Sequence, residues 1–193
     1  MSSDANHEAQ ASVPEGAAST APSGARGRST KHAVTARTKA RRRAVEILFE
    51  ADQRGLLKAS HNEADRFDEA LTGSNAAATR LRKLAAERAV NSANHTEAPA
   101  YTREILAGVA DHLAEIDEAL DTHAKDWSVS RMPAVDRAIA RVATWEIIWN
   151  DDVDAPVAVD EALTLAKMLS TDDSPRFLGG LLGRLGDLAD TLR

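Results

Sequence analysis

The chain lacks cysteine, has few aromatic residues and contains no long apolar run. Without cysteine it can form no disulfide and offers no thiolate for catalysis or metal binding. No stretch approaches the roughly 20 consecutive apolar residues that a transmembrane helix needs, and the N-terminus lacks the apolar core of a signal peptide. We therefore expect a cytoplasmic protein that does not associate with a membrane.

Alternating apolar and polar residues, the pattern of a half-buried strand, are also missing. Apolar residues instead recur every three or four positions, which predicts amphipathic helices. The clearest case is the segment 133–149, where Val135, Ile139, Val142, Trp145 and Trp149 fall on one side of a helix. Its other flank carries charges of both signs and is predicted to be a solvated surface. The fold class expected from this pattern is all-α, in one domain.

Helix signals divide the remainder of the chain. The predicted helices span 35–55, 63–71, 76–90, 101–123 and 133–149, with two more starting near Pro156 and Ser174. Gly55 is predicted to stop the first of them. Gly108 is expected to mark a close approach of another helix, and Gly179, Gly183 and Gly186 are expected to keep a helix face thin for tight packing. Residues 1–33, rich in Ser, Ala, Gly and Pro, are predicted to be a disordered tail before a helical domain at 34–193.

The charge distribution is uneven along the chain. Eight basic residues and no acidic ones lie between Arg26 and Arg43, so the rest of the chain, at a total of −6, carries −14. A basic segment on an otherwise acidic chain is typical of nucleic-acid contact, although a merely solvated cluster is the alternative. Several of these cations fall in the first half of a helix, where they oppose the helix dipole. This placement favours a role outside the helix.

Few aromatic residues are available for stacking on bases. Phe49 lies near the end of the basic helix, and Arg176 with Phe177 lies at the start of the last helix. Single-stranded RNA is held by cations on its phosphates and by flat side chains on its bases. Both phenylalanines could instead be buried in the core.

Residue patterns that would indicate an enzyme are missing. His112 and His123 are eleven residues apart, about 16 Å along a helix, and cannot share one metal ion. The glycines at 179–186 follow no strand and lack the spacing of a phosphate-binding loop. No acid and base pair can be discerned among the carboxylates. We expect no catalytic residue, no metal and no cofactor.

Several blocks of the sequence resemble the NusB family of bacterial transcription antitermination factors. The blocks, in chain order, are ARTKARRRAVEILFEAD (36–52), YTREILAGVADHLAEIDEAL (101–120), MPAVDRAIARVATWEI (132–147), PVAVDEALTLAK (156–167) and STDDSPRFLGGLLGRL (170–185). The resemblance implies two packed helical bundles and binding of boxA RNA, the antitermination signal of ribosomal RNA leaders. It further implies a heterodimer with the ribosomal protein NusE, within a transcription elongation complex.

The resemblance also assigns candidate site residues. Those implied in RNA binding are Arg37, Arg41, Phe49, Asp173, Arg176 and Phe177, and the neighbouring cations Lys39 and Arg42 are added to this set. Asp136 and Glu146 match acidic positions on the NusE-facing side. The chain departs from the family pattern at Gly180, where many members have Asn, and at Phe49, which replaces a Tyr and its hydroxyl.

Two alternative functions stay open at this point. Similar helical domains are fused to rRNA cytosine methyltransferases, although the chain leaves no room for a cofactor-binding domain. A homodimer that covers the RNA surface is the other alternative, because some members of the family look dimeric.

Overall fold

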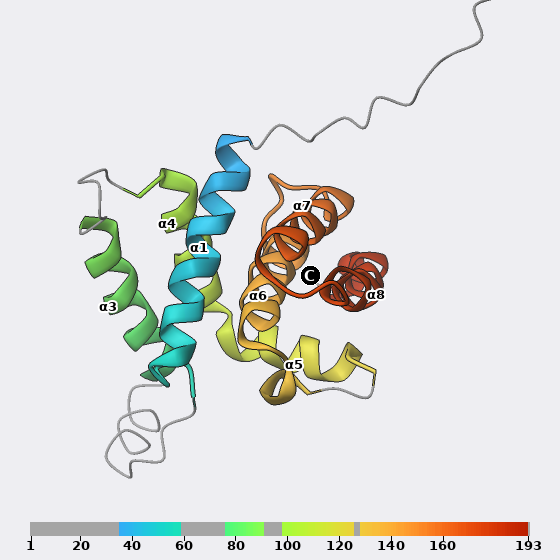
Figure 1. The fold of residues 1–193 in the computed structure, drawn as a ribbon, viewed down its shortest axis with the longest axis horizontal. Helices are drawn as coiled ribbons and strands as arrows, with labels where there is room; N and C mark the ends of the chain where they lie inside the picture. Colours follow the sequence, from blue (N-terminus) through green and yellow to red (C-terminus); the bar gives the residue numbers. More distant parts are fainter. Residues whose placement is uncertain (1–34, 59–75, 91–97, 126–127, 193) are drawn as a thin grey trace, which may run out of the picture. The chain divides into compact units, whose positions relative to one another are not determined.

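The computed structural model describes residues 35–58, 76–90, 98–125 and 128–192, and all regular structure in these ranges is helical. The helices, labelled as in Figure 1, are α1 (Ala36–Gln53), α3 (Ala76–Val90), α4 (Ala100–Asp111), α5 (Leu113–His123), η1 (Val129–Arg131), α6 (Ala134–Trp149), α7 (Ala155–Leu169), α8 (Ser174–Asp187) and α9 (Ala189–Leu192). The predicted all-α fold class is confirmed. The predicted tail at 1–33 and the predicted helix at 63–71 lie outside the described residues.

The helices of the unit formed by residues 34–193 pack in two groups. Helices α1, α3 and α4 contact one another, and α5, α6, α7 and α8 form the second group. Figure 1 shows α1 of the first group and α6 of the second group side by side, and both α1 and α4 pack on α6. This arrangement is the pair of packed bundles that the family resemblance implied.

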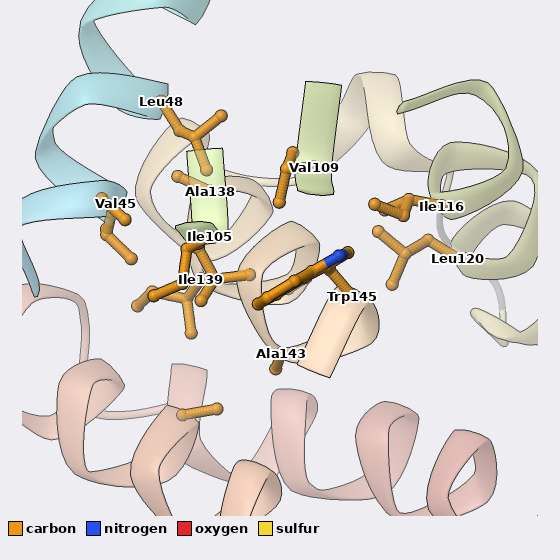
Figure 2. Packing of buried hydrophobic residues seen from close by; sticks show 14 of the residues in the cluster. Val45, Leu48, Ile105, Val109, Ile116, Leu120, Ala138, Ile139, Ala143 and Trp145 are labelled. Carbon is orange, nitrogen blue, oxygen red and sulfur yellow. The ribbon is translucent and has the colours of Figure 1, made fainter. Parts of the chain in front are cut away.

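One continuous hydrophobic core runs through both groups. Figure 2 shows Trp145 of α6 among apolar side chains of the neighbouring helices. Those neighbours come from α1, α4 and α5 and include Val45, Leu48, Ile105, Val109, Ile116 and Leu120. Burying a large apolar side chain contributes about 1.5–3 kcal/mol to folding, so this core supplies the main stabilisation.

Both ends of α1 follow from local chemistry. The Thr35 hydroxyl accepts the backbone N–H of Thr38 at 3.0 Å and caps the first turn. At the other end Gly55 has φ of 69°, in the left-handed region that glycine adopts without strain. The prediction that Gly55 stops this helix is confirmed.

The single helix predicted at 101–123 is wrong, because the chain bends at His112. Its backbone angles, φ −115° and ψ 21°, are not helical and separate α4 from α5. The His112 ring stacks on Trp149 of α6, with 4.5 Å between ring centroids. The bend lets α4 pack on α1 and α3 while α5 packs on α6 and α8. Since only one residue leaves the helix, the apolar spacing continues across the bend and conceals it.

The solvated flank predicted for α6 is also wrong. Asp136, Arg141 and Glu146 are 2%, 3% and 1% exposed, respectively. The reason is that α6, a member of the second group, also packs on α1 and α4 of the first group, so helices of both groups cover its sides. Its charged groups are instead paired inside the protein: the Arg141 guanidinium donates two hydrogen bonds of 2.8 Å to Asp117 on α5.

Gly108 marks the expected close approach, and the structure predicts the cost of removing it. A Cβ atom at this position would overlap the indole of Trp145, a rigid side chain only 6% exposed. We expect Gly108→Ala to lower the free energy of unfolding by about 1–3 kcal/mol, as overpacking does in other cores. Urea denaturation of the purified variant measures this change.

Gly183 provides the matched control, because the predicted thin face is not confirmed there. A Cβ at Gly183 would meet nothing within 4 Å, and at Gly179 and Gly186 it would meet only ordinary contacts. Gly183→Ala is therefore expected to stabilise α8 by up to about 1 kcal/mol, because alanine loses less backbone entropy in a helix. Equal effects of the two substitutions would contradict the packing described here.

Candidate nucleic-acid interface

The first turns of α1 present two cations to solvent. Arg37 and Lys39 are exposed, and no carboxylate of the described residues contacts either one. Cations that are not paired with a carboxylate can neutralise a phosphate without first breaking an ion pair. These two predicted RNA contacts are therefore available at the surface.

Arg42 and Arg43 are engaged in weak surface pairs. Their guanidinium groups lie 3.1 and 3.2 Å from the carboxylate of Glu46, on the same side of α1. Exposed pairs of this kind contribute about 0.2–1 kcal/mol, so a phosphate can compete for either arginine. The predicted RNA contact of Arg42 stays a prediction.

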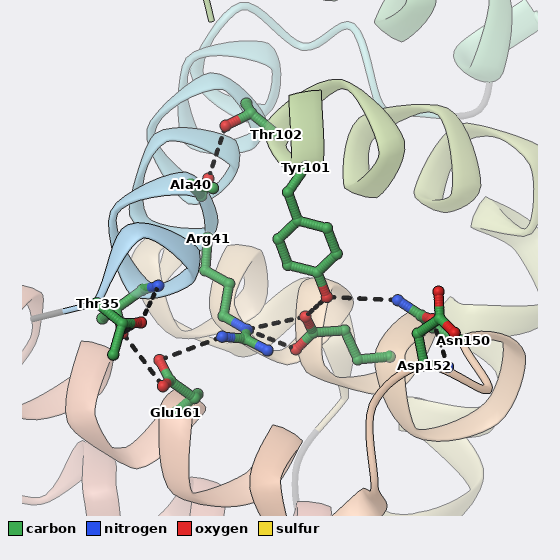
Figure 3. Close-up of polar contacts among 10 residues, drawn as sticks. Thr35, Ala40, Arg41, Tyr101, Thr102, Asn150, Asp152 and Glu161 are labelled. Carbon is green, nitrogen blue, oxygen red and sulfur yellow. Dashed lines mark hydrogen bonds and ion pairs between the residues drawn. The ribbon is translucent and has the colours of Figure 1, made fainter. Parts of the chain in front are cut away.

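Arg41 does not lie on the surface that the sequence interpretation gave it. Its side chain is 2% exposed, and its Nε lies 2.8 and 3.0 Å from the two carboxylate oxygens of Glu146. The Nη1 atom of Arg41 lies 3.4 Å from the Oε2 atom of Glu161 on α7 (Figure 3). Arg41 therefore joins α1 to α6 and α7, and in this structure it presents no N–H group to RNA.

Glu146 is likewise an internal residue rather than an exposed partner contact. It accepts hydrogen bonds from Arg41 and from the hydroxyl of Tyr101, and it is 1% exposed. Burial raises the pKa of Glu146 above its usual range, and the nearby Arg41 charge opposes that rise. A carboxylate held in this way cannot reach a partner protein without opening the core.

Tyr101 is a site residue that the sequence analysis missed. The centroid of its ring lies 5.1 Å from the guanidinium group of Arg37 and 5.4 Å from that of Arg41. Its hydroxyl donates to Glu146 and accepts from Asn150 at 3.3 Å (Figure 3). The sequence carried no signal for this role, because Tyr101 stands one turn before Ile105 and fits the apolar stripe of its helix.

The same surroundings predict an unusual titration. Burial, and then the hydrogen bond to Glu146, raise the pKa of Tyr101 well above its ordinary value of about 10. Tyr101 is the only tyrosine in the chain, so tyrosinate absorbance reports on it alone. We expect the folded protein to show no tyrosinate signal near pH 10–11, whereas the urea-unfolded chain titrates near pH 10.

The sign of the linked stability effect follows. A tyrosine whose pKa is raised by folding contributes stability that is complete below the unfolded pKa, about 10, and is lost as the pH rises above it. The unfolding free energy should therefore fall above pH 10 in the wild type, and fall less in Tyr101→Phe. Ordinary titration of the folded protein near pH 10 would rule out the buried hydroxyl.

A second group of predicted residues meets at a pocket between α6 and α8. The pocket has a volume of about 270 Å³ and is lined by Pro133, Asp136, Thr171, Asp173, Ser174 and Phe177. It combines the half-buried ring of Phe177 with the exposed carboxylate of Asp173. Arg176 is exposed on the same first turn of α8. The structure thus brings together three of the predicted RNA-binding residues and Asp136.

Asp136 forms the inner wall of this pocket. Its carboxylate accepts hydrogen bonds from the hydroxyls of Ser170 and Ser174, at 2.5 and 2.8 Å. Both serines flank the loop that leads into α8, so Asp136 holds that loop on α6. The predicted contact between Asp136 and NusE therefore requires a side chain of NusE to enter this pocket.

Phe49 lies on the outer side of α1 with 37% of its surface exposed. An aromatic ring at this exposure can stack on a base, as predicted, without leaving a gap in the core.

Within the described ranges no group of His, Asp and Glu side chains could hold a metal ion, and no described helix has the length and apolarity to cross a bilayer.

Comparison with known proteins identifies the relatives of this chain. The model of the NusB family matches residues 38–187. The transcription antitermination protein NusB of Beutenbergia cavernae is 50% identical over 83% of this chain and 95% of its own length. That of Arthrobacter sp. strain FB24 is 45% identical over 82% of this chain and 98% of its own.

Solved structures share the fold. A structure described as T. maritima NusB has a TM-score of 0.57 at 23% identity and covers 79% of this chain and 92% of its own. A second, described as a plectonemic RNA supercoil, has a TM-score of 0.55 at 20% identity and covers 81% of this chain and 98% of its own. With the sequence matches given above, the chain belongs to the NusB family.

Proposed function

We propose that this chain is a transcription antitermination factor that binds boxA RNA of ribosomal RNA leaders together with NusE, within the transcription elongation complex. The observation that carries the proposal is the pair of exposed cations, Arg37 and Lys39, on the first turns of α1. The relatives are transcription antitermination proteins, a name that denotes a regulatory rather than a catalytic role. Family membership and the surface chemistry thus support the same function.

The proposed RNA surface has two parts. Arg37 and Lys39, joined by Arg42, would neutralise phosphates, which is the sequence-independent part of binding. Phe177 and the exposed Phe49 would each offer a ring on which a splayed base can stack, with Asp173 and Arg176 beside the first of them. Arg41 supports this surface from inside rather than touching RNA.

The partner contact needs a different assignment from the one that the sequence suggested. Glu146 is buried and hydrogen-bonded to Arg41, and the pocket between α6 and α8 is the route by which a partner side chain would reach Asp136. The proposed NusE contact therefore involves the mouth of that pocket, where Asp173 can attract a basic side chain.

A gel-shift experiment tests this function. The full chain is mixed with a boxA oligonucleotide or with a scrambled one of the same composition, each with and without NusE. We expect the boxA complex to form at lower protein concentration than the scrambled one, and NusE to widen that difference. Equal binding of both oligonucleotides in the presence of NusE would reject sequence-specific boxA recognition.

A homodimer is a second candidate state, and one surface feature favours it. Val157 and Met168 are 48% and 44% exposed, and their eleven-residue spacing places them on the same side of α7. Sedimentation of the chain alone and with NusE separates the two states. A dimer that persists when NusE is added would support the homodimer over the heterodimer.

The methyltransferase alternative is disfavoured by the lengths of the relatives. The matches cover 95–98% of the antitermination proteins of Beutenbergia cavernae and Arthrobacter. The likeness is thus to entire proteins of this kind rather than to one domain of a larger enzyme.

A further inference from the structure

The aromatic ring of Tyr101 lies directly behind the exposed arginine of the proposed RNA surface. Arg37 and Arg41 are four residues apart and therefore share one side of α1, which faces the first turn of α4. Their guanidinium groups lie 5.1 and 5.4 Å from the centroid of the Tyr101 ring. Arg41 is buried and Arg37 is exposed, so the Tyr101 ring lies at the boundary between the interior of the protein and its surface.

The position of this ring is fixed from several directions. Its hydroxyl is held by Glu146 and by Asn150, and Glu146 is itself held by Arg41. The next residue, Thr102, donates a 3.0 Å hydrogen bond to the carbonyl of Ala40, which ties α4 to α1 (Figure 3). The ring is therefore a rigid support, whereas an exposed arginine in water samples many rotamers.

We infer that Tyr101 is a positioning residue, which holds the guanidinium of Arg37 ready for an RNA phosphate. A guanidinium that lies on an aromatic ring uses its flat face for that contact and keeps the N–H groups at its edge for hydrogen bonds. Ordering before binding reduces the entropy that is lost when the phosphate is gripped. Two carboxylates of the neighbouring helices, Glu146 and Glu161, are engaged by Arg41 and Thr38.

The inference rests on the proposed function. Its test therefore includes one measurement made without RNA, so that failure of the inference can be distinguished from failure of the proposed function. The order of the Arg37 Nε–H group is measured by NMR relaxation in the wild type, in Tyr101→Phe and in Tyr101→Leu. Phenylalanine keeps the ring and leucine removes it. We expect an ordered Arg37 side chain in the wild type and in Tyr101→Phe, and a flexible one, with an order parameter below about 0.6, in Tyr101→Leu. A flexible Arg37 in the wild type would overturn the inference.

The second readout is the affinity for a boxA oligonucleotide at one salt concentration. Tyr101→Leu should weaken binding by about two- to fivefold, the size of an exposed cation–π contribution, while Tyr101→Phe stays within twofold of the wild type. In an Arg37→Ala background the leucine substitution should have no further effect. An equal loss with and without Arg37 would mean that Tyr101 acts only on folding or touches RNA itself, and would overturn the inference.

A third variant covers the case in which Tyr101→Leu does not fold. Arg37→Lys keeps the charge but replaces the flat guanidinium by a compact ammonium. We expect its salt dependence to match the wild type and its affinity to fall by about two- to fivefold. Unchanged affinity would overturn the inference. If Arg37 is ordered by the ring but the wild type does not bind boxA RNA, the proposed function fails and the positioning of Arg37 stands.

Discussion

Replacing Arg41 by alanine is expected to lower the free energy of unfolding by about 3–5 kcal/mol, the usual cost of removing one partner from a buried ion pair. The cause is the carboxylate left behind, because Glu146 is 1% exposed and takes its shortest charged contact, 2.8 Å, from Arg41. Small domains are stable by only about 5–15 kcal/mol, so this loss is a large fraction of the total. Urea denaturation followed by circular dichroism measures it.

Arg42 is the matched control for this experiment. It is the next residue on the same helix, and among the described residues it forms an ion pair only with the exposed Glu46. Arg42→Ala should change the unfolding free energy by no more than about 0.5 kcal/mol. If Arg41→Ala were as mild as Arg42→Ala, the buried pair would contribute nothing and Arg41 would be free to serve at the surface.

The double substitution Arg37→Ala with Lys39→Ala is expected to weaken binding of boxA RNA on the order of tenfold, because each exposed ionic contact contributes up to roughly 1 kcal/mol. Each phosphate contact that is lost also reduces the number of counterions released when the protein binds RNA. The slope of log affinity against log salt should therefore become shallower by about 1.4, which is two contacts at 0.7 each for a single strand. Fluorescence anisotropy at four or more salt concentrations gives both quantities.

Lys167 supplies the control for net charge. It is an exposed cation in the last turn of α7 and not on α1. Lys167→Ala should leave the affinity and the salt slope unchanged, and both variants should unfold at the wild-type urea concentration. A loss as large for Lys167→Ala as for the double variant would mean that RNA responds to total charge rather than to the α1 surface.

Helices α1, α3, α6, α7 and α8, and their order, could be predicted because each carries its own periodic apolar stripe. The bounds of α3 and the stop at Gly55 are local properties, set within a few residues of the chain. The bend at His112 could not be predicted, because its cause is packing on Trp149, which is 37 residues away in sequence and on another helix.

The site was predicted less completely, for a related reason. Arg37 and Arg41 are the same residue type on the same side of α1, and nothing local distinguishes the exposed one from the buried one. Their difference depends on Glu146, 105 residues further along the chain, and on Glu161 in α7. The family resemblance gave the positions of these residues but not their burial.

A crystal structure of the chain in complex with NusE and a boxA oligonucleotide tests the central claim most directly. That claim is that the surface cations of α1 bind RNA phosphates, while the buried Arg41 holds α1 in place. We predict Arg37 and Lys39 within hydrogen-bond distance of phosphate oxygens, with Arg41 still on Glu146. An RNA strand bound elsewhere on the molecule, with Arg37 and Lys39 in solvent, would contradict it.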